Sequence, residues 1–389
     1  MTRRPVPPAA DVLIPAYNAE RTIGEAVASI QRQSVRDIAI HIVDDGSTDA
    51  TPAILHDIAA ADPRVHVHSR PNGGIVEALN AGLRHCTAEF IARHDADDIA
   101  YPERLAVQLA CLRARPEFAA VGAAARHIDA TGAPTGSIAR LDQPDRADPF
   151  RVPAKEPYLI HPFLTVRRAA IEAVGGYRHA CHAEDSDLYW RLSEQGRLHN
   201  LPDLLGDYRL HADSISGGSI VNGRIMAIGS QLGAFSARRR RRGVPDLPFP
   251  KDRLAAFRAA GSLAAMVTIA ARDLDPDELE PFEESVAAKL LELASYRPYE
   301  LDGEDCAFVG HVARRGFGHL PPVERVAQIR RISGTAARIA VSGRMDDALR
   351  MVAPGLGRAF ALRYLARIAL PGRIRGALRR DATRDAPVK

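Results

Sequence analysis

Residues 38–49 read IAIHIVDDGSTD, and this stretch decides the fold of the first half of the chain. A strand-like run from Ile38 to Val43 ends in the acidic turn Asp44-Asp45, and a helical pattern follows over residues 51–61. A buried strand that passes through a polar turn into a helix is typical of an α/β fold with a parallel sheet. In such sheets ligands bind beyond the carboxyl ends of the strands. The acidic turn therefore lies where a ligand site is expected.

The same alternation extends in both directions, from about residue 11 to residue 125. The pattern predicts strands at residues 12–14, 65–68 and 89–93, and helices at residues 23–32, 76–83 and after Pro102. We therefore expect a mainly parallel sheet with helices on both faces.

The remainder of the chain is less regular at first and then helical. Between residues 125 and 215 we predict a turn at 129–132, a long loop at 141–157, a helix at 185–195, and strands near 163–166, 198–201 and 204–210. Beyond Ser216 the pattern is helical, with breaks at residues 243–250, 273–276, 297–304, 316–322 and 371–372. The predicted fold class is thus an α/β sheet domain followed by a mostly α-helical region.

Composition excludes two broad classes of protein. The chain has 389 residues, of which 46% are hydrophobic and 26% charged, so it is not a wholly disordered protein. The longest run of apolar and small residues, Leu263–Ala271, is far shorter than the roughly 20 residues of a spanning helix. The basic start at Arg3-Arg4 is followed by prolines, so no signal peptide is expected. Four cysteines without a CxxC pair indicate reduced thiols in a cytoplasmic protein.

Charge is distributed unevenly along the chain. The formal net charge is +4, but acidic residues exceed basic ones up to residue 215 and basic residues exceed acidic ones beyond it. Arg238–Arg242 is an unbroken run of five arginines, which suits a solvated face, anionic lipid or a polyanionic acceptor, and nucleic acid less well. The basic segment 358–389, interleaved with apolar residues, suits an interfacial helix on anionic lipid or a terminal helix packed on its own domain. We expect the tail after Arg380 to be disordered.

Two polar clusters follow the first two predicted strands. Pro15-Ala16-Tyr17-Asn18 places an aromatic ring at a strand end, where it could stack on a nucleotide base or form only a turn. Asp44-Asp45 could accept hydrogen bonds from a ribose or a base. A helix cap would need only Ser47 or Asp49, so capping does not account for the pair.

Two further acidic clusters lie beyond the next strands. His94-Asp95-Ala96-Asp97-Asp98 brings together carboxylates that repel one another unless a cation neutralises them, which favours a Mg²⁺ or Mn²⁺ site over a solvated loop. Glu184 and Asp185 begin a predicted helix. There they could stabilise the helix dipole, or one could act as a general base.

The motifs PAYN, VDDGSTD, DADD and AEDSDLYWRL occur in this order, with His161-Pro162 and the segment 208–211 at matching intervals. This set resembles that of the family 2 glycosyltransferases, which have the GT-A nucleotide-sugar-binding fold, over about residues 10–215. The resemblance implies a GT-A catalytic domain at residues 1–215 and a helical, basic region at residues 216–389.

The resemblance also implies roles for matching residues. Donor-binding residues would be Pro15, Tyr17, Asp44, Asp45, Asn72, Gly73, Asp95 and Ala96. Metal ligands would be Asp95, Asp97 and His211. The catalytic base would be Asp185, with Glu184 beside it. The donor-sugar and acceptor region would contain His161, Gly175, Gly176 and Trp190.

The implied activity is that of an inverting, metal-dependent hexosyltransferase that uses Mg²⁺ or Mn²⁺. Its donor would be a nucleotide-diphosphate sugar, with UDP- and dTDP-sugars favoured, and its acceptor a glycan or a lipid-linked glycan in bacterial surface polysaccharide synthesis. We expect a cytoplasmic protein, with peripheral contact to the inner face of the cell membrane through its basic region, and no nucleic-acid partner. Oligomeric state is left open.

Two rival functions are considered. A non-catalytic nucleotide-sugar-binding or scaffolding protein could keep the same fold, but it would not need both Asp97 and Asp185. A phosphotransferase of the haloacid dehalogenase type would carry its DxD motif after the first strand, whereas here the motif follows the fourth.

Overall fold

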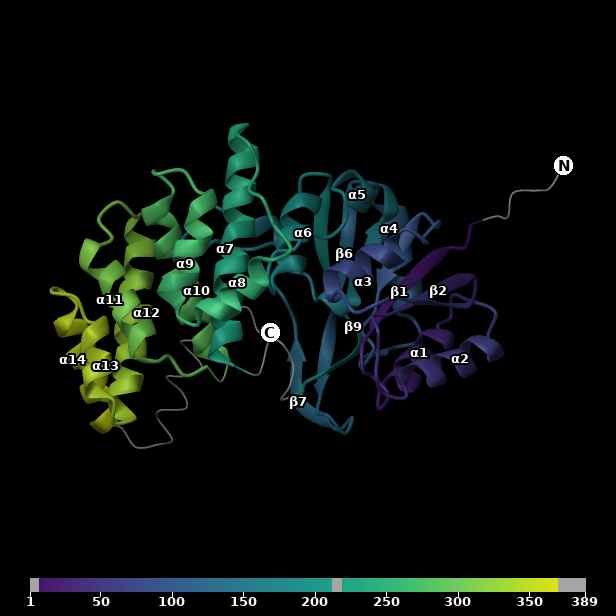
Figure 1. Ribbon diagram of the computed structural model, residues 1–389, viewed down its shortest axis with the longest axis horizontal. Coiled ribbons are helices and arrows are strands. Elements are labelled where there is room, and N and C mark those ends of the chain that lie inside the picture. Colours follow the sequence, from purple (N-terminus) through teal and green to yellow (C-terminus); the bar gives the residue numbers. More distant parts are fainter. Residues whose placement is uncertain (1–6, 212–218, 298, 370–389) are drawn as a thin grey trace.

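The structure, a computed structural model, describes residues 7–211, 219–297 and 299–369. Figure 1 shows a sheet flanked by helices on both faces, coloured purple to teal, and beside it the helices of the second half of the chain, coloured green to yellow. The predicted fold class, a GT-A type α/β sheet followed by a helical region, is confirmed.

The first half of the chain alternates strands and helices up to α4. Its elements are β1 (Ala10–Ala16), α1 (Ile23–Gln31), β2 (Ile38–Asp44), α2 (Thr51–Ala61), β3 (Val65–Ser69), α3 (Ile75–Leu83), β4 (Phe90–Arg93), β5 (Ile99–Ala100), α4 (Arg104–Ala114), β6 (Phe118–Ile128), β7 (Pro134–Ala139), β8 (Thr165–Arg167), α5 (Arg168–Ala173), α6 (Glu184–Leu192) and β9 (Arg197–Arg209). Short 3₁₀ turns lie at Pro144–Arg146 and His161–Phe163.

These strands form one nine-stranded sheet. Its order is β3-β2-β1-β4-β8-β6-β9-β5, with β7 paired to β6. Strands β3, β2, β1 and β4 are parallel to one another, and β9 is parallel to β6. Strands β5, β7 and β8 pair in the antiparallel direction. The carboxyl ends of β1, β2, β3 and β4 consequently meet at one edge.

Alternating residues of β1 enter two different cores. Val12 and Ile14 pack with residues of α1, α2 and α4 on one face of the sheet, while Leu13 packs with residues of α3, α5 and α6 on the other. Since both faces are covered, the central strands are apolar along their whole length, as parallel strands in α/β folds are.

The second half of the chain is helical where it is described. Its elements are α7 (Ile220–Arg242), α8 (Arg253–Ala260), α9 (Leu263–Ala270), a 3₁₀ turn (Ala271–Asp273), α10 (Leu279–Tyr296), α11 (Gly303–Arg315), α12 (Pro322–Val341), α13 (Met345–Met351) and α14 (Gly357–Ala369). They share a separate hydrophobic core. Division of the chain near residue 215 stays a prediction, because α7 also packs closely on α6.

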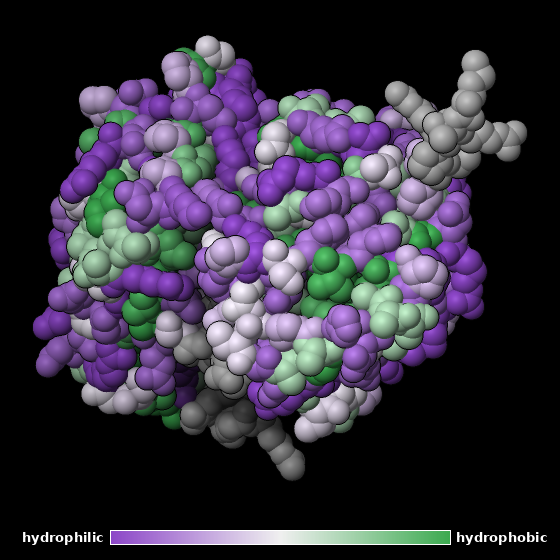
Figure 2. Space-filling model, turned by 45° about the vertical axis from the view of Figure 1, so that its right-hand side comes forward, coloured by the Kyte–Doolittle hydropathy of each residue, from purple (hydrophilic) through white to green (hydrophobic). Residues whose placement is uncertain are grey.

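None of the helices in the described ranges is both long and apolar enough to cross a membrane. The face shown in Figure 2 is mostly hydrophilic, and its hydrophobic residues gather in small separate patches.

Most of the predicted element positions are confirmed, but some are corrected, and β7 and α5 were not predicted. The strands expected at 198–201 and 204–210 are one continuous strand, β9, which is irregular where it pairs with β6. The long central strand β6 was not predicted, because its run of alanines has no strand-like alternation. Helices also break at residues 261–262, 342–344 and 352–356, where no break was predicted. The predicted break at 371–372 and the tail after residue 380 lie outside the described residues.

The run of five arginines is not the solvated face that its sequence suggests. Arg238 and Arg239 are buried at the end of α7. Arg239 pairs with Glu278, and Arg240 pairs with Glu194. Only Arg241 and Arg242 of the run are exposed. The structure therefore uses most of this charge to fix α7 against neighbouring elements.

Candidate active site

The ends of the parallel strands place the predicted donor-binding residues beside one another. Ala16 of β1 pairs with Asp44 of β2, and the Asp45 N–H donates to the Ala16 carbonyl at 2.9 Å. On the other side of β1, the His94 N–H donates to the Leu13 carbonyl at 3.0 Å. Residues that directly follow β1, β2 and β4 therefore share one edge of the sheet.

Tyr17 presents its ring at this edge. Its exposed fraction is 52%, whereas the neighbouring Pro15 is buried within β1. Asn18 has a left-handed backbone (φ 48°) and accepts the Thr48 N–H through Oδ1 at 2.8 Å. Because this turn is fixed to the loop after β2, the Tyr17 ring is held in a position where a flat heterocycle could stack on it.

Asp44 and Asp45 are both buried and both hold loops. Asp44 Oδ1 accepts the Ser47 N–H at 3.1 Å. Asp45 accepts the Gly74 N–H at 2.7 Å and the Gly73 N–H at 3.1 Å, and it forms an ion pair with Arg70. The contacts of Asp45 thus fix the loop after β3, in which Asn72 is exposed, beside the ends of β1 and β2. Base recognition by Asp45 stays a prediction.

The acidic loop after β4 gathers three carboxylates. Oxygen atoms of Asp95, Asp97 and Asp98 lie within 4.8 Å of one another. His211, just beyond the end of β9, brings Nε2 to 2.9 Å from Asp97 Oδ2. Asp98 is buried, and its Oδ1 accepts the Arg209 N–H at 2.8 Å. Ala96 is partly buried and packs against the core, which leaves the carboxylates on either side to face the edge.

Burial and mutual repulsion of the carboxylates raise pKa values in this loop. Burial, and then the Asp95 carboxylate, raise the pKa of Asp97. Burial, and then Asp97, raise the pKa of Asp98 well above its usual range. Oxygen-rich, mutually repelling ligands with one imidazole fit a hard divalent cation such as Mg²⁺ or Mn²⁺. The residues present therefore fit the metal that the resemblance implies.

Arg93 is a candidate functional residue that the sequence reasoning missed. It is buried at the end of β4 and forms an ion pair with Asp95. Its Nε and Nη1 atoms have no hydrogen-bond partner among the described residues. Asp95 outweighs burial and raises the pKa of Arg93. An arginine inside an otherwise apolar strand, directly before HDADD, was the available signal.

Glu184 and Asp185 occupy the first turn of α6, as predicted. Cys181 and His182 precede them with left-handed backbones (φ 43° and 60°), a conformation that non-glycine residues rarely adopt. Burial, and then the Asp185 charge, raise the pKa of Glu184 to about 7, and Arg93 and Asp95 also act on it. The two acidic clusters are therefore close enough to influence each other.

Comparison with known proteins agrees with this arrangement. Residues 11–175 match the family model described as Glycosyl transferase family 2. EpsE of Bacillus subtilis, whose name describes a glycosyltransferase, is 32% identical over 213 residues, which cover 53% of this chain and 74% of EpsE. The amylovoran biosynthesis glycosyltransferase AmsE of Erwinia amylovora is 32% identical over 53% of this chain and 77% of its own. The chain belongs to glycosyltransferase family 2.

A solved structure is similar as well. The mannosyltransferase PcManGT from Pyrobaculum calidifontis, in complex with GDP-Man and Mn²⁺, is 18% identical to this glycosyltransferase. The match covers 93% of this chain and 88% of that chain, with a TM-score of 0.48. The family model and the two sequence relatives confirm the predicted family and the glycosyltransferase enzyme class.

Of three residues assigned to the sugar region of the glycosyltransferase, Gly176 contacts α6 directly. His161 Nε2 lies 2.8 Å from the Tyr177 hydroxyl, and burial lowers the pKa of His161 well below its usual value. Gly175 and Gly176 both have left-handed backbones, and a Cβ at Gly176 would lie 2.6 Å from Asn80 Oδ1. The Gly176 carbonyl accepts from Arg191 of α6. Contact of these residues with sugar stays a prediction.

Trp190 does not belong to the sugar region. It is 1% exposed and packs in a cluster with Ala154, Ala234 and Ala237, so it faces α7. Helical spacing predicts that Trp190 lies on the apolar face of its helix. It does not show which element packs against that face. The assignment of Trp190 is therefore corrected to a packing role between α6 and α7.

A buried ion pair supports α6 from the C-terminal helices. Lys289 of α10 lies 2.6 Å from Glu156 Oε1 and 2.9 Å from Glu292 Oε1. Glu156 also accepts from the hydroxyls of Ser186, the residue after Asp185, and Ser230 of α7. This network was not predicted, because its members are far apart in the sequence. A lysine inside the otherwise apolar run 286–291 was the available signal.

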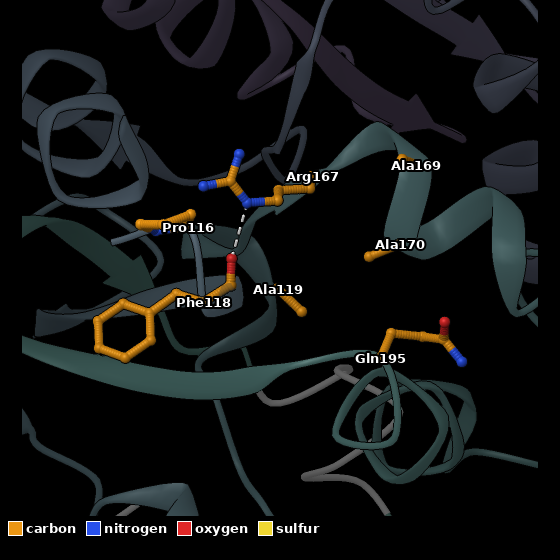
Figure 3. A pocket seen from close by; sticks show the side chains of 7 residues that line it. All are labelled: Pro116, Phe118, Ala119, Arg167, Ala169, Ala170 and Gln195. Carbon is orange, nitrogen blue, oxygen red and sulfur yellow. Dashed lines mark hydrogen bonds between the residues drawn. The ribbon is translucent and has the colours of Figure 1, made fainter. Parts of the chain in front are cut away.

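One surface pocket lies away from these residues. Its volume is about 220 Å³, and Figure 3 shows the side chains that line it, from Pro116 and Phe118 to Gln195. Arg167 spans it and donates through Nε to the Phe118 carbonyl at 2.9 Å. No residue assigned to donor, metal or base lines this pocket, so it plays no part in the reaction considered below.

Titration of Glu184 makes a prediction about stability. Its pKa in the folded protein, about 7, exceeds the ordinary value of 4.5, so folding strengthens proton binding. The stability that this stronger proton binding contributes to the fold is fully present below about pH 4.5. It is lost as the pH rises through about 7. We therefore expect the melting temperature of Glu184→Gln, relative to wild type, to rise between about pH 5 and pH 8. Thermal melts across this range measure the difference.

The matched control for this prediction is Glu172→Gln, which changes an exposed carboxylate. The Glu172 carboxylate pairs with Arg168 at the surface, so the difference in melting temperature from wild type should change less with pH than for Glu184→Gln. Parallel curves for Glu184→Gln and wild type would contradict the assigned titration.

Proposed function

We propose that this glycosyltransferase transfers a sugar, with inversion, from a nucleotide-diphosphate donor to a glycan or lipid-linked acceptor. UDP- and dTDP-sugars are the favoured donors. The observation that carries the proposal is the pairing of two acidic clusters at one edge of the sheet. Asp95, Asp97 and His211 form one, and Glu184 and Asp185 form the other.

Donor binding is assigned to the edge formed by β1, β2 and β4. The exposed Tyr17 ring would stack on the base, with Asp45 and the loop that it holds alongside. Asp95, Asp97 and His211 would hold Mg²⁺ or Mn²⁺. When bound, this ion would neutralise negative charge on the diphosphate. Arg93, already ion-paired to Asp95, adds a fixed positive charge beneath the same loop.

Transfer is assigned to the start of α6. The acceptor hydroxyl attacks the anomeric carbon while Asp185 accepts the hydroxyl proton. A bond forms between that carbon and the acceptor oxygen, and the bond to the diphosphate oxygen breaks on the opposite side. An α-linked donor therefore gives a β-linked product. Glu184, with a pKa of about 7, limits the negative charge beside Asp185 at neutral pH.

Donor binding is tested with nucleotide sugars, Mn²⁺ and thermal shift. One nucleotide class should stabilise the wild-type protein, by about 2.7 kcal/mol at 100 times its Kd, and EDTA should abolish the effect. Asp97→Asn should lose this stabilisation because it removes a carboxylate of the acidic loop. Asp203→Asn, which changes an exposed carboxylate on β9, is the matched control and should keep it.

Two results of this screen would count against the proposal. Equal stabilisation of wild type and Asp97→Asn would remove the acidic loop from donor binding. Donor binding without release of nucleoside diphosphate, with every acceptor class offered, would favour the non-catalytic binding protein.

We also propose that the protein is cytoplasmic and contacts an anionic membrane surface through α14. Leu362, Leu365 and Ile368 are all more than half exposed on this helix, and Arg363 and Arg367 lie beside them. An apolar stripe next to arginines suits the interface of an anionic bilayer. The protein should float with vesicles containing phosphatidylglycerol, and Leu362→Glu should prevent this. Equal flotation with neutral vesicles would contradict an electrostatic contribution.

A further inference from the structure

A second cluster of potential metal ligands lies at the opposite end of β1. Asp11 of β1, His41 of β2 and Cys86, just after α3, are buried, with exposed fractions of 0%, 7% and 7%. One ligand atom from each lies within 4.8 Å of the other two. Asp11 precedes Tyr17 by six residues of strand, or about 20 Å. The cluster is therefore separate from the edge of the sheet that carries Tyr17.

Spacing within the cluster fits a tetrahedral ion. His41 Nε2 lies 3.3 Å from Asp11 Oδ1. Two ligands held about 2.0–2.1 Å from a tetrahedral Zn²⁺ are separated by about 3.4 Å. The observed separation is long for a hydrogen bond with a buried carboxylate, where 2.7–2.9 Å is usual.

The carboxylate of Asp11 is fixed in this orientation. Its Oδ2 accepts the N–H groups of Thr87 at 2.5 Å and Ala88 at 2.7 Å. These bonds occupy Oδ2 and leave Oδ1 directed at His41. Since the same loop carries Cys86, the backbone that fixes the carboxylate also places the thiol.

A group of histidines leads from the surface to His41. His41 Nδ1 lies 3.3 Å from His68 Nε2, and the His68 ring stacks on exposed His85 with centroids 3.8 Å apart. Through Nε2, His68 can accept the Nδ1 proton of His41. That bond would leave His41 Nε2 unprotonated and facing the Asp11 carboxylate, as a metal-bound histidine requires.

We propose that Asp11, His41 and Cys86 bind one Zn²⁺ ion, with His68 orienting His41. A carboxylate, an imidazole and a thiolate suit Zn²⁺, whereas the oxygen-rich loop after β4 suits Mg²⁺ or Mn²⁺. The ion would join the start of β1, the middle of β2 and the loop before β4. Binding releases the Cys86 thiol proton to solvent, and water completes the four ligands.

The test uses the full chain, stripped with a chelator and titrated with Co²⁺ as a spectroscopic substitute for Zn²⁺. We expect one equivalent of tetrahedral Co²⁺ with a thiolate-to-cobalt charge-transfer band, and competition of this signal by Zn²⁺. Cys86→Ser should lose the band, while Cys111→Ser, a matched change at a cysteine on α4, should keep it. Absence of the band in wild type, or its persistence in Cys86→Ser, would overturn the proposal.

A second variant separates metal binding from folding. His68→Asn should weaken Zn²⁺ binding about 10–100-fold, because it changes an outer partner and removes no ligand. Its circular dichroism spectrum without metal should match that of wild type. Unchanged Zn²⁺ affinity in this variant would mean that the histidines form only a hydrogen-bonded chain. Co²⁺ bound at the loop after β4 would give no thiolate band. The band therefore tests the site of Asp11, His41 and Cys86 alone, and its loss can be distinguished from a failure of the proposed donor site.

Discussion

Replacement of Asp185 by asparagine is expected to slow sugar transfer by roughly two to four orders of magnitude, the usual contribution of a general base. Asparagine has the same shape, and its Oδ1 can still accept the Ser186 N–H that Asp185 accepts at 2.7 Å. It cannot take a proton from the acceptor hydroxyl. Donor affinity should therefore stay within about two-fold, because the donor-binding edge is unchanged. Release of nucleoside diphosphate measures the rate, and thermal shift measures donor binding.

Asp203→Asn provides the matched control, since it makes the same chemical change at an exposed residue. Its rate should equal that of wild type. If Asp185→Asn kept more than about a tenth of the wild-type rate, Asp185 would not be the base, and Glu184 would be the next residue to change.

Replacement of Lys289 by methionine is expected to destabilise the fold by about 3–5 kcal/mol. Lys289 is 1% exposed, and Glu156 beside it is 7% exposed, so methionine would leave the Glu156 carboxylate buried without its cation. The loss corresponds to a melting temperature lower by roughly 4–6 °C for a chain of 389 residues. Thermal and urea unfolding measure it.

Two companion variants distinguish the buried pair from a general effect of lysine removal. Lys251→Met removes a lysine whose side chain is 63% exposed and should cost at most about 1 kcal/mol. Lys289→Met combined with Glu156→Gln should recover part of the loss, because the buried partner is then neutral. Equal stability of the Lys289→Met and Lys251→Met variants would contradict the interpretation.

The sequence predicted the sheet edge better than the contacts at that edge. Apolar runs ending in PAYN, VDDG and HDADD locate strand ends, because a parallel strand buried on both faces must be apolar along its length. Strand ends alone did not bring Asp97 and His211 together. Only the family resemblance did. Nothing local to Asp45 indicated that its carboxylate holds Gly73 and Gly74.

Long-range packing set the limit of prediction on both sides of the boundary between α6 and α7. Arg239 looks like a solvent-facing residue until its partner Glu278, 39 positions away, is known. Trp190 is on the apolar face of α6, but only the structure shows that α7 covers it. Burial of both residues depends on contacts between elements that local patterns do not encode.

Helix α7 has a consequence for engineering chimeric enzymes. A Cβ at Gly229 would lie 2.4 Å from the Ala180 carbonyl, so the helix axis runs close against the turn that leads to Glu184 and Asp185. In the same interface Arg178 donates to Ser236 of α7. Recombination between homologous enzymes at residue 215, where the family resemblance ends, would place a foreign helix against this turn. A crossover after Gly243 keeps α7 with the catalytic half and leaves the later helices free to be exchanged.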